Sequence, residues 1–266
     1  MLLLRRPRFR WVKLNVDAAN PEKSPLTRTQ AMRLGLRFPR RERGRWFGFA
    51  IDLIWPLLVL GARLRFRGTE HLPKDGGVLV ASNHLSFADP VTMTAFCLAG
   101  GRVPRYLAKS ELWSGRVVGS VMSSGKHIPV QRDAGARAAY LAYKAAVDAV
   151  RDGECVVVFP EAGFSTRDDG WPSEGKAGLA KVALTTGVPV VPVANWGTHH
   201  LLPPDAKLPK VFPRRSVTLV AGPPVDLSDL AGPRPTSSAV AEANARVMAA
   251  VTELLAEVRG ESPPAA

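Results

Sequence analysis

The chain has 266 residues, of which 46% are hydrophobic and 22% are charged. These values are typical of one large globular domain with appendages and exclude a wholly disordered chain. Two cysteines, Cys97 and Cys155, are too few for a disulfide framework or a four-thiolate zinc site, and their apolar neighbours predict buried free thiols.

The net charge of +13 is concentrated at the N-terminus. Residues 1–45 hold 13 Lys and Arg side chains against three acidic ones, so this basic arm carries +10 of the total. A basic arm before a nearly neutral body indicates a polyanionic partner, either nucleic acid or anionic lipid. A merely solubilising tail is the alternative interpretation.

The apolar segment that follows the arm favours lipid. Residues 46–62 read WFGFAIDLIWPLLVLGA, with Asp52 as the one charged side chain and Pro56 expected to kink or break a helix. As a helix these 17 residues extend about 25 Å, less than the ~30 Å hydrocarbon core, and a mid-span Asp costs about 2.5–3.5 kcal/mol. We therefore predict a helix that lies in one leaflet, with Trp46 and Trp55 at the interface. A buried core helix is the alternative.

The start of the chain, MLLLRRPRFR, lacks the long apolar run of a secretory signal peptide. The body is therefore expected on the cytoplasmic face of the cell membrane, as a peripheral or monotopic protein. Anionic membrane lipids are the expected partners of the arm. A nucleic-acid partner is not expected, because no known nucleic-acid-binding module is visible in the sequence.

Beyond residue 64, short apolar runs alternate with helical patterns. The runs are continuous, which is typical of strands buried on both faces of an open sheet. We predict a single α/β domain over residues 65–225, with a largely parallel or mixed central sheet flanked by helices. It follows the arm (1–45) and a membrane-associating segment (46–64), and a C-terminal helix and tail (226–266) come after it. The expected strands are 78–81, 106–108, 128–130, 155–159, 188–193 and 217–220, and the expected helices are 90–99, 136–151, 176–186 and 238–259.

Candidate chemistry lies where predicted strands end, as is usual in open α/β sheets. His84 follows one strand, and Asp89 stands at the start of the next helix. If the loop folds back, the carboxylate can fix the imidazole tautomer and leave the other ring nitrogen as a base. The alternative is that Asp89 only caps its helix and that His84 is an ordinary loop histidine.

Two further strand ends carry charged side chains. Glu161 follows the strand 155–159, where it could hydrogen-bond a polyol, or it is an exposed acid in a turn. Arg132 follows the strand 128–130, where it could bind a phosphate through two parallel hydrogen bonds, or it is a surface arginine.

Taken together, four sequence blocks resemble the glycerolipid acyltransferases of the PlsC-like family, which acylate lysophosphatidic acid and related acceptors. The order and spacing agree over residues 78–195, with looser similarity to about residue 225, and include Lys176 and Gly178 before the last block. An Asn-His-x4-Asp block is matched by Asn83, His84 and Asp89, and a Gly…Ile…Arg block by Gly125, Ile128 and Arg132. A Phe-Pro-Glu-Gly block is matched in part by Phe159, Pro160 and Glu161, and a Val-Pro block by residues 188–192, ending at Pro192.

The resemblance implies a mechanism. His84 would be the general base toward an acceptor hydroxyl, with Asp89 orienting it, and the hydroxyl would attack the thioester of acyl-CoA or acyl carrier protein. Backbone N–H groups near Gly125, or Lys109, would stabilise the oxyanion. Arg132 would hold the acceptor phosphate. The remaining expected roles are Glu161 on the glycerol, Asn83, Phe159 and Pro160 as supports of the motifs, and Pro192 as a structural residue that shapes an acyl tunnel.

The implied acceptor is a lysophospholipid, first of all 1-acyl-sn-glycerol-3-phosphate, which would give phosphatidic acid in phospholipid biosynthesis. No metal, no cofactor other than the acyl carrier and no nucleophilic Ser or Cys is expected. One departure leaves the acceptor open. The family usually continues its third block with Gly-Thr-Arg-Ser or Gly-Thr-x-Ser, whereas this chain reads Ala162, Gly163, Phe164, Ser165. Arg167 could replace the missing arginine, and another lysolipid or polyol lipid could be the acceptor.

Other functional classes fit the sequence less well. A phosphate loop needs four residues between its glycines and Ser or Thr after Lys, but five separate Gly119 from Gly125, and His127 follows Lys126. The absence of a Gly-x-Ser-x-Gly motif from the chain argues strongly against a serine hydrolase. An inactive member of the same family remains an alternative. The adjacent pair at residues 199–200 is interpreted as loop histidines, because neighbouring histidines rarely face one ion.

Overall fold

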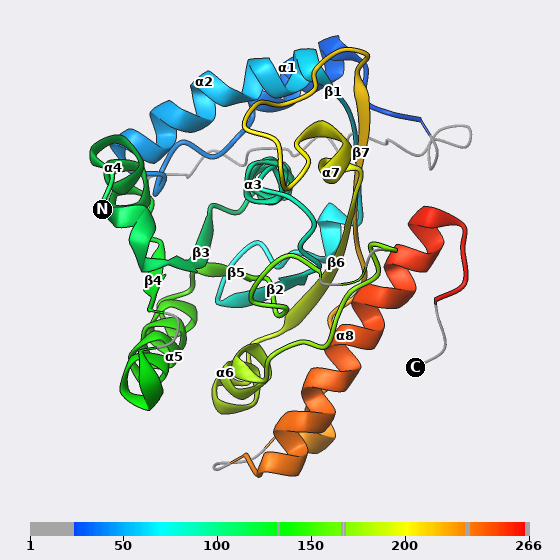
Figure 1. The fold of residues 1–266 in the computed structure, drawn as a ribbon. Coiled ribbons are helices and arrows are strands. Elements are labelled where there is room, and N and C mark those ends of the chain that lie inside the picture. Colours follow the sequence, from blue (N-terminus) through cyan, green and yellow to red (C-terminus); the bar gives the residue numbers. More distant parts are fainter. Residues whose placement is uncertain (1–23, 132–133, 166, 168, 232–234, 264–266) are drawn as a thin grey trace, which may run out of the picture.

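The computed structural model describes residues 24–131, 134–165, 167, 169–231 and 235–263. Its centre is a seven-stranded sheet in the order β1-β7-β6-β2-β5-β3-β4, with helices on both faces (Figure 1). Strands β2 to β6 are parallel to one another, β7 is antiparallel to β6, and β1 is parallel to β7. The strands are β1 (Ala62–Arg67), β2 (Val78–Ser82), β3 (Pro104–Lys109), β4 (Ile128–Val130), β5 (Cys155–Val158), β6 (Val190–Trp196) and β7 (Arg215–Ala221).

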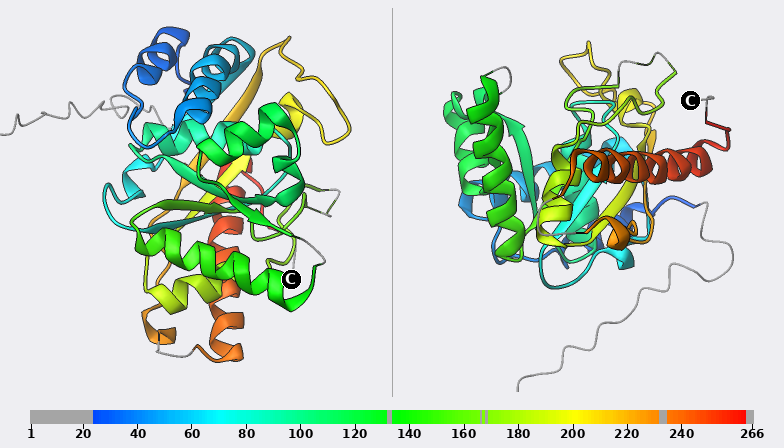
Figure 2. Two further views of the ribbon diagram at one scale, coloured as in Figure 1. Left: turned by 90° about the vertical axis from the view of Figure 1, so that its left-hand side faces the viewer. Right: turned by 90° about the horizontal axis from the view of Figure 1, so that it is seen from below.

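Two helical layers cover the sheet, as the views in Figures 1 and 2 show together. Helices α2 and α3 pack on one face, and α1 and α4 contact α2, while α5, α6 and α8 cover the other face. The helices are α1 (Arg28–Gly35), α2 (Arg45–Gly61), α3 (Asp89–Ala99), α4 (Arg116–Ser124), α5 (Gly135–Arg151), α6 (Gly178–Thr186), α7 (Thr198–Leu201) and α8 (Ser237–Arg259). Short 3-10 turns cover Thr69–His71, Ser110–Trp113 and Ser228–Leu230.

The sequence of β2 explains why this strand lies at the centre of the sheet. All five of its side chains are buried. Val78 and Val80 join the hydrophobic cluster under α2 and α3, whereas Leu79 and Ala81 join the cluster under α5, α6 and α8. Successive side chains of a strand point to opposite faces, so a continuous apolar run can line two cores at once.

The predicted fold class is confirmed: a single α/β domain contains a mixed sheet flanked by helices. The two cysteines are buried free thiols, as predicted. The sequence analysis missed β1, because its alternation of apolar residues with Arg63, Arg65 and Arg67 does not resemble a continuous apolar run. This pattern is typical of a strand at the edge of a sheet with one solvent-facing side. Most of the basic arm, residues 1–23, lies outside the described residues.

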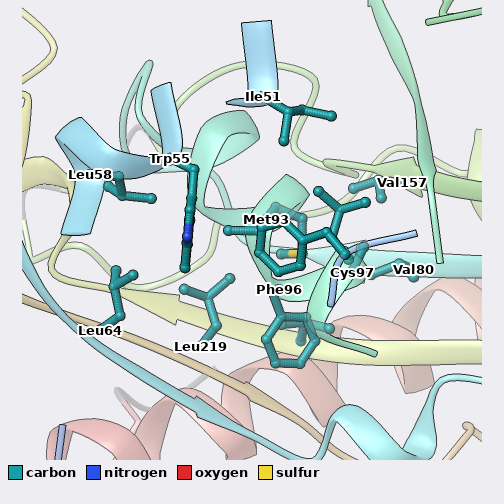
Figure 3. Close-up of a cluster of buried hydrophobic side chains, with 14 of the residues drawn as sticks. Ile51, Trp55, Leu58, Leu64, Val80, Met93, Phe96, Cys97, Val157 and Leu219 are labelled. Carbon is teal, nitrogen blue, oxygen red and sulfur yellow. The ribbon is translucent and has the colours of Figure 1, made fainter. Parts of the chain in front are cut away.

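Helix α2 is part of the core on one side. Phe47, Ile51, Trp55 and Leu58 are spaced at helical intervals and are buried in the core. Figure 3 shows Ile51, Trp55 and Leu58 beside side chains of α3 and the sheet. Of the kink or break expected at Pro56, the break does not occur, because the helix continues through this residue. The buried stripe on both sides of the proline accounts for this, because tertiary packing compensates for the missing backbone hydrogen bond.

The outer side of α2 is apolar but exposed. Trp46, Phe49, Leu53, Leu57 and Leu60 are each more than half exposed. Trp55 belongs to the buried side, so its predicted position at a membrane interface is wrong. Within the described residues, no helix combines the length and the hydrophobicity needed to cross a bilayer.

Asp52 on α2 is half exposed, and arginines of the same chain balance its charge. Its carboxylate lies 3.0 Å from Arg43 Nη1 and 3.6 Å from Arg40 Nη1. The segment between α1 and α2 therefore supplies the partners of the one acid in the apolar helix. Only apolar side chains are left on the exposed middle of α2, between Leu53 and Leu60.

Candidate active site

The loop after β2 folds back on the start of α3. His84 Nδ1 lies 2.8 Å from Asp89 Oδ2, and the same oxygen accepts hydrogen bonds from the backbone N–H groups of Leu85 (2.5 Å) and Ser86 (2.8 Å). Asp89 is fully buried, and the His84 side chain is 16% exposed. With the proton on Nδ1, Nε2 presents the lone pair that can accept a proton. The structure thus brings together the two side chains that the sequence analysis paired.

Aromatic rings hold the imidazole of His84 from two directions. The ring of Phe159, just after β5, stacks on it with centroids 4.2 Å apart and an interplanar angle of 17°. Phe164 meets it edge-on at 4.6 Å and also contacts Phe87 at 4.7 Å. The residue that departs from the family pattern therefore lies directly against the candidate base.

Glu161 fixes the same loop through the backbone. One carboxylate oxygen accepts the N–H of His84 (2.9 Å), and the other accepts the N–H (2.9 Å) and the hydroxyl (2.7 Å) of Ser173. The side chain is buried. The neighbouring carbonyl of Pro160 accepts a hydrogen bond from the N–H of Lys176 (2.8 Å). Both oxygens of Glu161 have partners within the protein, so it positions His84.

Asn83 ties the loop to the adjacent strand β6. Its side-chain amide donates to the carbonyl of Asn195 (2.8 Å), and its side-chain oxygen accepts the N–H of Asn195 (2.8 Å). Both residues are fully buried. Sequence reasoning missed Asn195, although a lone amide in the apolar run VVPVANW is a detectable polar interruption.

A cavity of about 460 Å³ opens beside His84, between α2, α3, α4 and β3. Its walls are mostly apolar, and they include the inner side of α2. Lys109, at the end of β3, is the one Lys, Arg, Asp or Glu that lines it among the described residues. A cavity of this size and character suits an alkyl chain. The principal lining residues are Ile51, Trp55, Val91, Leu98, Val121 and Phe159.

The two predicted sources of oxyanion donors differ in position. Lys109 lines the cavity, but Gly125 does not. The N–H of Gly125 donates to the carbonyl of Val121 (2.9 Å), so it cannot serve a substrate oxygen. A Cβ at Gly125 would lie 2.6 Å from His127 Nε2, so this glycine makes room for that ring. Burial, and then the charge of Arg105, lowers the pKa of His127 to about 4.

Two other expected residues, Pro192 and Arg167, do not line the cavity. Arg132 lies outside the described residues. Pro192 is in the middle of β6, with its Cγ near Gly222, and it does not line this cavity, so its role in shaping a tunnel stays a prediction. Pro192 pairs with Ala81, which faces the opposite core. Arg167 pairs with Asp169 (2.9 Å), and its replacement of the missing arginine stays a prediction.

No cluster of His, Cys, Asp and Glu suited to a metal ion occurs among the described residues. His199 and His200 lie on α7, where their rings contact each other and Trp196. Burial, and then the neighbouring His200, lowers the pKa of His199 to about 4. These two histidines therefore belong to an aromatic cluster on a short helix, so the predicted loop location is wrong.

Comparison with known proteins identifies the family. The family described as Acyltransferase matches residues 63–196, which include β2, the His84 loop, β5 and β6. This chain belongs to the acyltransferase family. The resemblance to the PlsC-like enzymes is thereby confirmed, and the acyltransferase carries its His–Asp pair inside the matched region.

Individual relatives support this assignment. The acyltransferase is 27% identical over 188 residues to the 1-acyl-sn-glycerol-3-phosphate acyltransferase of Bacillus subtilis, which covers 70% of this chain and 85% of that protein. It is 33% identical over 138 residues to the chloroplastic 1-acyl-sn-glycerol-3-phosphate acyltransferase BAT2 of Brassica napus, which covers 52% of this chain and 38% of that protein. The crystal structure of PlsC, the 1-acyl-sn-glycerophosphate acyltransferase from Thermotoga maritima, shares the fold. Its TM-score is 0.58 at 22% identity, covering 90% of this chain and 100% of that one.

Proposed function

We propose that this acyltransferase moves a fatty acyl group from a thioester to the free hydroxyl of a lysophospholipid, first of all 1-acyl-sn-glycerol-3-phosphate, to form phosphatidic acid. The names of the relatives from Bacillus subtilis and Brassica napus support this acceptor. The observation that carries the proposal is the 2.8 Å contact between His84 and Asp89 beside an apolar cavity of about 460 Å³. The reaction needs a proton acceptor beside a space for an alkyl chain, and this site offers both.

In the proposed reaction His84 Nε2 takes the proton of the acceptor hydroxyl while that oxygen attacks the thioester carbonyl carbon. The new C–O bond converts the carbonyl oxygen to an oxyanion. When the oxyanion collapses, the C–S bond breaks, and the imidazolium returns its proton to the departing thiolate. Asp89 stabilises the imidazolium between these steps. The products are an ester and a free thiol, without a covalent acyl-enzyme, a metal or a cofactor besides the acyl carrier.

The proposed donor is acyl-CoA or the acylated form of acyl carrier protein. Other residues of the chain are proposed to bind the substrates and to stabilise the oxyanion. Lys109 is the candidate for contact with the oxyanion, because it is a cation on the cavity wall. Arg132 is proposed to hold the acceptor phosphate, as the family resemblance implies. Glu161 is proposed to hold the backbone of His84. A contact of Glu161 with the acceptor glycerol would have to form while this hydrogen bond is kept.

The enzyme is proposed to work on the cytoplasmic face of the cell membrane as a peripheral or monotopic protein. The exposed apolar side of α2 would lie in one leaflet, and the basic arm would contact anionic lipids. The inner side of the same helix lines the cavity. An acyl chain could then pass from the leaflet to His84 along α2.

A second candidate is a different polyol or lysolipid acceptor, and Phe164 favours it. This ring lies against His84 where the family usually has polar residues, which makes the adjoining wall less suited to a phosphate. A comparison of kcat/KM for lysophosphatidic acid and lysophosphatidylcholine separates the two candidates. Preference for the phosphate monoester supports the first candidate, and preference for the choline lipid supports the second.

Thiol release from palmitoyl-CoA in liposomes, with and without lysophosphatidic acid, tests the reaction. We expect acceptor-dependent release that disappears in His84→Ala. His71→Ala is the matched control, because His71 lies outside the cavity walls. Release without acceptor dependence would contradict the acyl transfer, and absence of release from both palmitoyl-CoA and palmitoyl acyl carrier protein would contradict the donor class.

A further inference from the structure

A second cavity, of about 430 Å³, lies between the ends of β6, β7 and β1. It shares no lining residue with the cavity at His84. Its walls come from α7, α8 and the three strands. The side chains that give it its character are Arg65, Arg214, Arg215, His200, Trp196 and Ser216.

The charge of this arginine pocket is not neutralised by its own walls. Among the described residues, no acidic side chain lines it. The Nε atoms of Arg65, Arg214 and Arg215 are each shielded from solvent, and none has a hydrogen-bond partner within the described part of the chain. Unpaired, shielded guanidinium N–H groups are costly unless an anion accepts their hydrogen bonds.

Several charged groups around the pocket already have partners within the protein. Arg214 Nη2 donates to the carbonyls of Val59 (2.8 Å) and Ala62 (2.5 Å), at the junction of α2 and β1, which holds the guanidinium in place. The acids of the nearby end of α8 already have partners. Glu257 contacts Arg67 (2.9 Å), and Glu261 contacts Arg259 (2.5 Å).

Cations in and around the pocket disfavour its positive charges. Partial burial, and then the charges of Arg28 and Arg63, which lie outside the pocket walls, lowers the pKa of Arg214. Burial, and then Arg215, lowers the pKa of His200. A bound anion would relieve this repulsion, and a phosphate suits it because a guanidinium fork can bind two of its oxygens in parallel.

The loop before Arg214 points to the source of the anion. Leu208 is 78% exposed, Val211 is 49% exposed and Phe212 is 90% exposed, and Lys207 and Lys210 stand among them. This combination of exposed apolar and basic side chains is typical of segments at a bilayer surface.

The same loop continues the exposed side of α2. Val211 packs against Gly61, the last residue of α2, where an added Cβ would lie 2.7 Å from Val211 Cγ1. The loop, α1 and α2 lie at the same upper end in Figure 1 and in the left view of Figure 2, and the right view of Figure 2 shows them on opposite sides of that end. A bilayer that meets α2 would therefore also meet this loop, directly beside the arginine pocket.

We propose that the arginine pocket is a second lipid site, which binds the phosphate monoester of an anionic phospholipid such as phosphatidic acid while Leu208, Val211 and Phe212 insert among the acyl chains. The inference rests on the proposed membrane association. It does not depend on the transfer reaction at His84. The pocket would hold the enzyme preferentially on membrane regions rich in phosphate monoester lipids.

The test is flotation with three kinds of vesicle, without acyl donor: phosphatidylcholine alone, and phosphatidylcholine containing either phosphatidic acid or phosphatidylglycerol at matched surface charge. The pocket variant is Arg65→Gln with Arg215→Gln. The matched control is Arg137→Gln with Arg151→Gln on α5, which removes the same charge from exposed positions. We expect the pocket variant to bind phosphatidic acid vesicles about tenfold more weakly, and the control and wild type to bind them alike.

Two further measurements keep the test decisive. Arg215→Lys retains the charge but loses the fork, so it should also weaken binding to phosphatidic acid vesicles if the pocket recognises phosphate, and thermal melting checks that each variant is folded. Leu208→Ser with Phe212→Ser should weaken binding to all three vesicles by a similar factor. Equal binding of wild type to the two anionic vesicles, or equal losses in the pocket and control variants, would overturn the proposal. Full release from phosphatidic acid vesicles by millimolar inorganic phosphate or CoA would also overturn it, in favour of a soluble phosphate ligand.

Discussion

At the scale of single residues, His84 is held by partners from the end of β5 and from the start of α3. Asp89 fixes its ring through a hydrogen bond, Glu161 fixes its backbone, and Phe159 stacks on its face. Such a ring cannot turn away from the cavity without breaking several contacts at once. A base held in place before substrate arrives needs little reorganisation during the reaction.

For catalysis, the negative charge of Asp89 should matter more than the hydrogen bonds that its side chain accepts from the backbone. In Asp89→Asn the side-chain oxygen can still accept the N–H groups of Leu85 and Ser86, but it no longer stabilises an imidazolium. We expect kcat/KM for thiol release to fall about 10²–10⁴-fold, with a small change in melting temperature. Asp75→Asn, at an exposed turn, is the control. Full activity of Asp89→Asn would remove Asp89 from the mechanism.

The buried His127 predicts a pH dependence of stability. Its pKa is lowered from 6.5 to about 4 in the folded protein, mainly by burial. Between these two pH values the unfolded chain binds a proton that the folded chain does not, so the free energy of unfolding falls as the pH falls from 6.5 towards 4. The loss from this group is at most about 3 kcal/mol.

Urea denaturation at pH 7 and pH 4.5 measures this loss. His127→Phe fills the same space without a titrating group and should make the pH dependence shallower. His199, whose pKa is also about 4, should retain its own part of the slope. An unchanged slope in His127→Phe would contradict the assignment.

Sequence reasoning found the residues that lie close together in the chain. The pairing of His84 with Asp89 was predictable because a five-residue loop needs only to fold back. The partners Asn195 and Ser173 were not predictable, because the first lies 112 residues from Asn83 and the second 12 residues from Glu161. The pairing of β2 with β6 brings Asn195 to Asn83, and the path of the segment between β5 and α6 brings Ser173 to Glu161. The contact between Phe164 and His84 was not predictable either, because these residues are far apart in the chain.

At the scale of elements, α2 shows why hydrophobicity alone gave two interpretations. The helix is apolar all round, so the sequence could not separate a core helix from a membrane helix. The structure shows that one side is core and the other is exposed. Strand β1 was missed for the opposite reason, because three of its six residues are arginines.

The two sides of α2 should respond differently to substitution. Leu53→Gln with Leu57→Gln changes the exposed side, so it should weaken liposome binding and leave the melting temperature nearly unchanged. Leu58→Ala changes the buried side and should cost about 2–5 kcal/mol of unfolding free energy. Flotation and thermal denaturation of both proteins test this. A large loss of stability from the outer pair, without loss of liposome binding, would contradict a membrane-facing side.

At the scale of the whole molecule, the sequence was sufficient for the layer architecture. Continuous apolar runs predicted strands buried on both faces, and these strands are β2, β5 and β6 at the centre of the sheet. The sequence could not predict that β7 runs antiparallel to β6 and carries β1 at the edge. That arrangement depends on contacts between segments far apart in the chain, and it creates the arginine pocket.

The basic arm should act through charge. Deleting residues 1–23 removes a net charge of +4 and leaves α1 and α2 in the chain. We expect binding to anionic vesicles to weaken much more at low salt than at high salt, because ions screen such contacts. Flotation at 20 mM and 500 mM NaCl measures this difference. Equal losses at both salt concentrations would contradict an electrostatic role.

The most direct test of the account is the formation of phosphatidic acid from lysophosphatidic acid and a palmitoyl thioester, measured by mass spectrometry alongside released thiol. The account predicts one new ester for each thiol released by the wild-type enzyme. It also predicts a loss of at least about 10²-fold in His84→Ala. Thiol release without the diacyl product, or undiminished product from His84→Ala, would contradict it.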